Sequence, residues 1–277
     1  MAAPPSPGMT AHMEWWLAYL ATGAFSGFFA GMLGIGGGLI MVPILVLVLE
    51  AQGLPASQVL HLALGTSMAT IAFTAVSSLR AHHAHGAVVW AIVLGITPGI
   101  VFGTLFGTTL AASLETRPLS ILFAVFVYLA AGQILLDFRP RTARSLPGRA
   151  GMFAAGSVIG AVSSLVAVGG GIMSVPFMTW CSVTLHRAIG TSAAIGLPIA
   201  AAGTLGYIAN GLRAGALPEY SLGFVHLPAL AGLAAASMVT APLGARTAHR
   251  LPVHTLKRVF AVFLLVLATR MLYKLLA

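Results

Sequence analysis

The sequence predicts an all-α polytopic membrane protein, built from two inverted repeats with glycine-broken helices and about 8–10 membrane segments. Three observations lead to this fold class. The chain is 58% hydrophobic and only 7% charged, whereas soluble domains carry roughly 25% charged residues. Several uncharged stretches are long enough to cross ~30 Å of hydrocarbon at ~1.5 Å per residue. Glycine-rich strings of the first half return in the second half.

The repeated strings contain a triple glycine followed by a proline. The string from Gly27 to Gly38 precedes Pro43, and its counterpart from Gly160 to Gly171 precedes Pro176. Interrupted apolar segments at corresponding places in two halves are typical of transporter folds, whose binding site lies between the repeats.

Ten apolar segments can be marked along the chain, each a candidate helix. Their approximate bounds, in order, are 15–33, 39–50, 57–79, 87–111, 118–136, 150–168, 172–184, 187–209, 222–243 and 254–276. The polar stretch 137–149 separates a first transmembrane repeat, 15–136, from a second, 150–276.

Two segments, 39–50 and 172–184, are too short to span the membrane comfortably, and each follows a triple glycine. Because each helical glycine costs about 1 kcal/mol relative to alanine, we expect breaks at 34–38 and 167–171. Whether each short segment spans or re-enters stays open. Either arrangement returns the chain to the same side, so that each repeat makes an odd number of crossings and the second is inverted.

Basic residues are unequally divided between the two predicted sides. With an external N-terminus, the outside carries Arg117, Arg213, Arg270 and Lys274. Cytoplasmic loops tend to be rich in Lys and Arg, which predicts that the 137–149 linker is cytoplasmic. The inside loops then hold Arg80, Arg139, Arg141, Arg144, Arg149, Arg187, Arg246, Arg250, Lys257 and Arg258.

The triple glycines are the first candidates for a substrate-binding site. Irregular backbone at membrane depth must face protein or a water-filled cavity, and a helix that restarts there presents free N–H groups to an anion. Close helix packing is the alternative interpretation. The predicted binding residues are Gly36, Gly37, Gly38, Gly169, Gly170 and Gly171.

Hydroxyl groups follow the glycine breaks in a second repeated string. The first half has His61-Leu-Ala-Leu-Gly-Thr66-Ser67 and the second has His186-Arg-Ala-Ile-Gly-Thr191-Ser192. These four hydroxyls could donate to an oxyanion, or could bond back to their own helix carbonyls. We expect Thr66, Ser67, Thr191 and Ser192 to line the binding site.

His61 and His186 are candidates for proton coupling, because no acidic residue lies deep in a predicted span. A packing or interfacial role is the alternative for both. The sequence shows no nucleophile–base pair, no nucleotide-binding loop and no basic nucleic-acid face, so neither an enzyme, a cofactor nor a nucleic-acid partner is expected. A metal-handling protein that uses His82, His83 and His85 is a competing interpretation.

With both glycine–proline strings and both Gly-Thr-Ser strings, the chain resembles the TauE/SafE family of sulfite exporters over about residues 20–275. The resemblance implies a multi-pass carrier in the plasma (inner) membrane for sulfite, an organosulfonate or a related organic acid. We therefore expect a small anionic solute and the lipid bilayer as partners, and alternating access as the mechanism. An anion channel is the other competitor, and homo-oligomerisation is left open.

Overall fold

The structure, a computed structural model, describes residues 9–33, 37–136, 145–215, 217–248 and 253–276. Within these ranges the chain forms ten α-helices and one short β-hairpin, which confirms the all-α fold class. In chain order they are α1 (Met9–Leu33), α2 (Gly38–Ala51), α3 (Ala56–Ala84), α4 (Trp90–Ser113), α5 (Thr116–Leu136), α6 (Arg149–Leu165), α7 (Gly171–Trp180), α8 (Leu185–Arg213), β1 (Ser221–Leu222), β2 (Val225–His226), α9 (Leu227–Ala248) and α10 (Val253–Leu276).

Five of the helices, α3, α4, α5, α8 and α9, are long and apolar enough to cross a membrane. Large apolar side chains on their outer faces are exposed, including Leu94 and Phe102 on α4 and Leu129 on α5. Lipid tails would cover such side chains in a bilayer, so these helices give the molecule the surface of an integral membrane protein.

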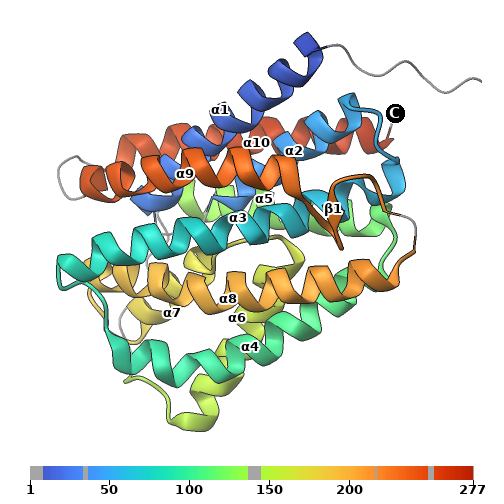
Figure 1. Cartoon of the computed structure of the whole chain (residues 1–277). Helices are drawn as coiled ribbons and strands as arrows, with labels where there is room; N and C mark the ends of the chain where they lie inside the picture. Colours follow the sequence, from blue (N-terminus) through green and yellow to red (C-terminus); the bar gives the residue numbers. More distant parts are fainter. Residues whose placement is uncertain (1–8, 34–36, 137–144, 216, 249–252, 277) are drawn as a thin grey trace, which may run out of the picture.

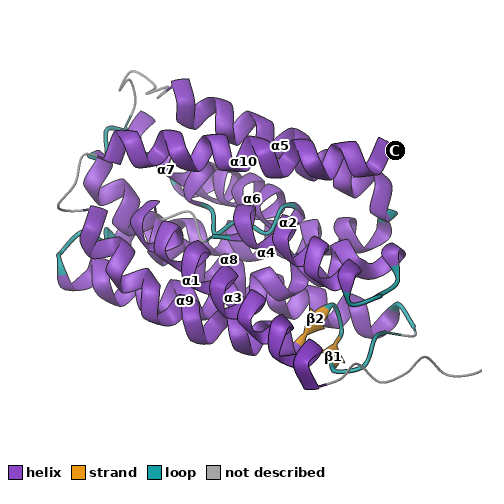
Figure 2. Cartoon of the chain, turned by 90° about the horizontal axis from the view of Figure 1, so that it is seen from above, coloured by secondary structure: helices purple, strands orange, loops and turns teal. Residues whose placement is uncertain are grey.

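Helices α3 and α8 lie side by side through the middle of the bundle (Figure 1). The α1–α9 pair packs beside α3, the α4–α6 pair packs beside α8, and α5 packs against α10 (Figure 2). Helix α1 of the first half thus pairs with α9 of the second, and α6 of the second half pairs with α4 of the first. The halves exchange packing partners, as two related repeats would; their inversion stays a prediction.

The helix termini gather at two ends of the bundle. At the hairpin end, where β1 and β2 lie, α1 begins and α10 ends (Figure 1). The Thr116 hydroxyl donates to the Ser57 carbonyl there (2.6 Å), which joins the start of α5 to the start of α3. At the opposite end, called the linker end below, α5 ends and α6 begins.

The two ends differ in charge. The described acidic residues, Glu14, Glu50, Glu115 and Glu219, all belong to segments at the hairpin end. Among the described residues, the linker end carries Arg80, Arg149, Arg187, Arg246 and Arg258 without an acidic partner. Most of the predicted linker, 137–144, lies outside the described residues.

Several segment boundaries differ from the sequence-based expectation; α1 starts at Met9 instead of residue 15, and α3 ends at Ala84 instead of residue 79. Helix α9 starts at Leu227 instead of residue 222. The reason is that Gly223 has a φ of 57°, which lets the chain form the β1–β2 hairpin before the helix. A Cβ on Gly223 would overlap the Ile208 carbonyl oxygen. Helix α7 ends at Trp180 instead of 184, just before Ser182, whose φ is 65°.

Candidate functional site

Both predicted helix breaks end in a left-handed glycine. Gly37 has a φ of 77° and precedes α2, and Gly170 has a φ of 82° and precedes α7. Side chains rarely adopt this conformation, which favours glycine. Each glycine carbonyl accepts the first hydrogen bond of the restarted helix, from Ile40 N–H and Met173 N–H respectively, both at 3.1 Å.

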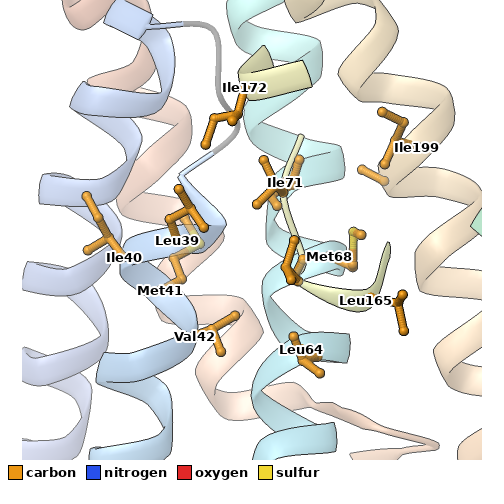
Figure 3. Close-up of a cluster of buried hydrophobic side chains, with 14 of the residues drawn as sticks. Leu39, Ile40, Met41, Val42, Leu64, Met68, Ile71, Leu165, Ile172 and Ile199 are labelled. Atoms are coloured by element: carbon orange, nitrogen blue, oxygen red, sulfur yellow. The ribbon is translucent and has the colours of Figure 1, made fainter. Parts of the chain in front are cut away.

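The two breaks meet in the middle of the bundle. A Cβ on Gly38 would overlap the carbonyl oxygen of Ala167 and lie 3.1 Å from Ile71 Cδ1, so the start of α2 touches the segment that leads into α7. A Cβ on Gly196 of α8 would lie 3.0 Å from the Gly169 oxygen. Figure 3 shows Leu39 of α2, Ile172 of α7 and Ile71 of α3 in this cluster. Gly36 lies outside the described residues.

The short helices α2 and α7 begin at this meeting point. With 14 and 10 residues they are about 21 and 15 Å long, less than the ~30 Å of a bilayer core. Neither helix has a side-chain hydrogen bond to its N-cap. Two sets of first-turn N–H groups, with their partial positive charge, are therefore presented in the interior.

A small cavity lies beside the second break. Its volume is about 10 Å³, roughly the space that one water occupies by this measure. Both halves contribute to its wall, and none of the lining residues is charged. The wall consists of Ala30, Ile71, Thr74, Ala75, Ser78, Gly169, Ala193 and Gly196. In the described conformation this central space therefore has room for about one water.

Thr66 and Thr191 each bind the opposite half of the chain. The Thr66 hydroxyl accepts a hydrogen bond from the backbone N–H of His226, just before α9 (2.9 Å). The Thr191 hydroxyl accepts one from the backbone N–H of Val89, just before α4 (3.0 Å). The two bonds lie at the hairpin end and the linker end respectively. Equivalent threonines thus join the halves at both ends of the central helices.

Ser67 and Ser192 differ in their surroundings although both are fully buried. The Ser67 hydroxyl has no hydrogen-bond partner among the described residues, whereas the Ser192 hydroxyl donates to the Ile189 carbonyl (2.8 Å). A buried hydroxyl without a partner is costly. Of the two, Ser67 thus has a donor left for a ligand, and neither serine is among the residues that line the central cavity.

His61 and His186 also differ. His61 is buried at the hairpin end, with Nε2 3.1 Å from the Ala111 carbonyl oxygen and its ring 5.1 Å from that of Phe224. His186 is exposed at the start of α8. Of the two, His61 alone therefore lies in the protein interior.

The histidines of the α3–α4 turn face separate partners. His82 Nε2 lies 3.4 Å from the Gly31 oxygen, His83 Nδ1 accepts from the indole of Trp90 (3.4 Å), and His85 Nδ1 lies 2.7 Å from the Ala81 oxygen. Within the described part of the chain, no group of three His, Cys, Asp or Glu side chains is placed to hold a metal.

A polar stripe along α3 is not among the sequence-based predictions. Thr66, Thr70, Thr74, Ser78 and His82 recur every four residues, on one helix face, and all are buried. The Thr70 hydroxyl donates to the Thr66 carbonyl (2.9 Å) and the Thr74 hydroxyl lies within hydrogen-bond distance of the Ser237 hydroxyl (2.9 Å). The Ser78 hydroxyl, at the cavity, has no hydrogen-bond partner within the part of the chain that the structure describes. The four-residue spacing is the sequence signal that marks it.

Comparisons with known proteins indicate a membrane transporter. The model of the protein family described as "Sulfite exporter TauE/SafE" matches residues 19–271. A Haemophilus influenzae protein named "Probable membrane transporter protein" is 38% identical over 260 residues, covering 93% of this chain and 98% of the relative. A Bacillus subtilis protein, "Probable membrane transporter protein YdhB", is 26% identical over 245 residues, covering 86% and 91%. No solved structure matches this chain.

Proposed function

This chain belongs to the sulfite exporter TauE/SafE family, and from that premise we propose that it is a secondary transporter for a small anion. The family and the relatives indicate a membrane transporter. The proposal adds the substrate class, the alternating-access mechanism and a location in the plasma membrane.

The meeting of the two helix breaks is the observation that carries the proposal. Helices α2 and α7 both begin there after left-handed glycines, beside a cavity whose lining contains no charged residue. First-turn N–H groups and the hydroxyl of Ser78 are donors, which suit an anion. A fixed charge near the bilayer centre is expensive, and neutral donors hold an anion reversibly. A sulfite, sulfonate or carboxylate group supplies the matching acceptors.

The exchanged threonine bonds support alternating access. Thr66 joins the halves at the hairpin end and Thr191 joins them at the linker end, so each end has its own contact between the halves. In our proposal one contact opens while the other holds, as one bundle rocks against the other. In this proposal the small central cavity widens toward one side at a time.

The test is binding by the purified full-length protein in detergent, measured by calorimetry. Sulfite, sulfoacetate and a short carboxylate are each titrated into the protein. Choline, a cation of similar size, is titrated separately as the control ligand. We expect saturable binding of at least one anion and none of choline. Loss of that binding in Ser78→Ala would support the cavity as its place. The control is Ser77→Ala, a half-buried neighbour on α3 that does not line the cavity and whose hydroxyl donates to the Met238 carbonyl. Binding of choline, or anion binding equal in both variants, would contradict the proposed site.

A further inference from the structure

A second, larger cavity lies between α2, α3, α5 and α10 at the hairpin end. Its volume is about 320 Å³, within the range of about 300–1,000 Å³ common for ligand sites. Val46 and Leu47 of α2 and Leu267 of α10 form its apolar walls, and these side chains are half-buried. Its lining shares no residue with the central cavity.

Charged residues stand at one end of this cavity. Lys274 of α10 forms a salt bridge with Glu50, the second-last residue of α2. Arg270, one turn earlier on α10, is exposed and makes no salt bridge with the described residues. The two cations and one carboxylate leave one positive charge, which a monovalent anionic group would neutralise.

The cavity is amphipathic along the direction of the helices. Pro43 of α2 lines the inner part of the cavity, and Glu50 lines it near the end of the same helix. The two residues are about 10 Å apart along α2 at ~1.5 Å per residue. Polar and charged groups thus lie near the membrane surface, and apolar groups lie deeper. The neighbouring face of α10 exposes Val262 and Val266, so that the apolar walls continue into a lipid-facing surface.

We propose that this cavity binds an anionic phospholipid. The phosphate lies between Arg270 and Lys274 at the headgroup level, and an acyl chain enters between α2 and α10. Basic clefts between transmembrane helices suit such headgroups, and the half-buried apolar walls suit a chain that stays in contact with the bilayer. A bound lipid would support α2, the helix that restarts after Gly37, and this site does not depend on which anion is transported.

The experiment compares phosphatidylglycerol with phosphatidylcholine, titrated onto the delipidated full-length protein and followed by native mass spectrometry. We expect tighter binding of phosphatidylglycerol. Arg270→Gln and Lys274→Gln should each weaken it about fivefold, since a basic residue near an anionic lipid contributes about 1 kcal/mol. Arg213→Gln, an exposed arginine at the same end, is the matched control and should change nothing.

A second pair of variants tests the acyl-chain site. Leu47→Trp fills the cavity and should abolish retention of the lipid, whereas Leu94→Trp, on the exposed face of α4 away from the cavity, should keep it. Equal binding of the two lipids, or equal effects of Arg270→Gln and Arg213→Gln, would overturn the proposal. So would a Leu47→Trp protein that keeps its lipid but changes oligomeric state, because the occupant would then be a second copy of the chain.

Discussion

At the residue scale, Ser67 and Ser192 hold the same place in the two halves but have different hydrogen bonds. Of these two hydroxyls, that of Ser67 lacks a hydrogen-bond partner among the described residues. We predict that the anion bonds to Ser67 at a second position, about 16 Å along α3 from Ser78, and that Ser67→Ala weakens binding there by roughly tenfold, since a hydrogen bond to a charged group contributes about 1.5–3 kcal/mol. Ser192→Ala should weaken it less. Calorimetric titration of the same anion with both variants checks this, and a larger loss in Ser192→Ala would contradict it.

The thermal stability of these variants provides an internal control. Because removing an unpartnered buried hydroxyl relieves a desolvation cost, Ser67→Ala should unfold at the same temperature as the parent or higher. A variant that lost both binding and stability would indicate a packing role for Ser67.

Thr66 and Thr191 carry a second prediction at the residue scale. Thr66→Val removes the acceptor of the His226 N–H, and Thr191→Val removes that of the Val89 N–H. An unpaired buried N–H costs about 1–3 kcal/mol, so each variant should unfold at a lower temperature in detergent. Thr66→Ser should restore most of the loss.

Thr109→Val is the matched control for these two variants. Thr109 is exposed on α4, and its hydroxyl donates within its own helix to Leu105 (2.9 Å). If Thr66→Val and Thr109→Val unfolded at the same temperature, the bond between the halves would contribute nothing measurable to stability.

At the scale of single elements, the start of α7 carries the third prediction. Gly170→Leu places a side chain in a left-handed position, with its Cβ 2.5 Å from Ile199 Cδ1 beside the central site. We expect transport to be abolished while membrane insertion is kept, as judged by flux in proteoliposomes and by the amount of protein in the membrane fraction. Gly37→Leu should act in the same way at the start of α2.

Gly53 offers a control with the same backbone conformation. Its φ is 79°, and a Cβ there would meet nothing within 4 Å. Gly53→Leu therefore carries the same left-handed strain, about 1–2 kcal/mol, far from the site. Loss of transport in Gly53→Leu as well would mean that strain alone explains the effect at Gly170.

The sequence predicts those elements that depend on interactions between residues close together in the chain. Apolar segment length and the triple glycines are local signals, and they predict all ten helices and the restarts of α2 and α7. The hairpin at Ser221–His226 is missed because its apolar residues continue the pattern of the following helix. Only Gly223, with its positive φ, marks the turn.

Contacts between residues far apart in the chain are not predicted by the sequence. A Gly31 packing face is predictable from small-residue spacing, but the closeness of that packing is not. A Cβ on Gly31 would overlap the Ala241 carbonyl oxygen of α9, so even alanine should be poorly tolerated. The partners of Thr66 and Thr191 lie far away in the chain, and the two residues are as well explained by joining the halves as by lining the site.

At the scale of the whole molecule, the two ends of the bundle predict the topology. Helix α10 ends at the hairpin end, and α5 ends at the linker end, which carries the uncompensated arginines. We predict an external C-terminus and a cytoplasmic linker. Reporter fusions at residue 277 and within 137–149 would check this, and reporters on the same side would contradict the inverted arrangement.

The central claim is that an anion is carried by alternating access through the site where α2 and α7 begin. The most direct measurement is counterflow in proteoliposomes, in which uptake of labelled sulfite or organosulfonate is followed with and without unlabelled anion inside. We predict saturable uptake that the internal anion accelerates, and no such uptake with Gly170→Leu. Uptake that does not saturate and is not accelerated by internal anion would show a channel, and equal counterflow in Gly170→Leu would place the path elsewhere.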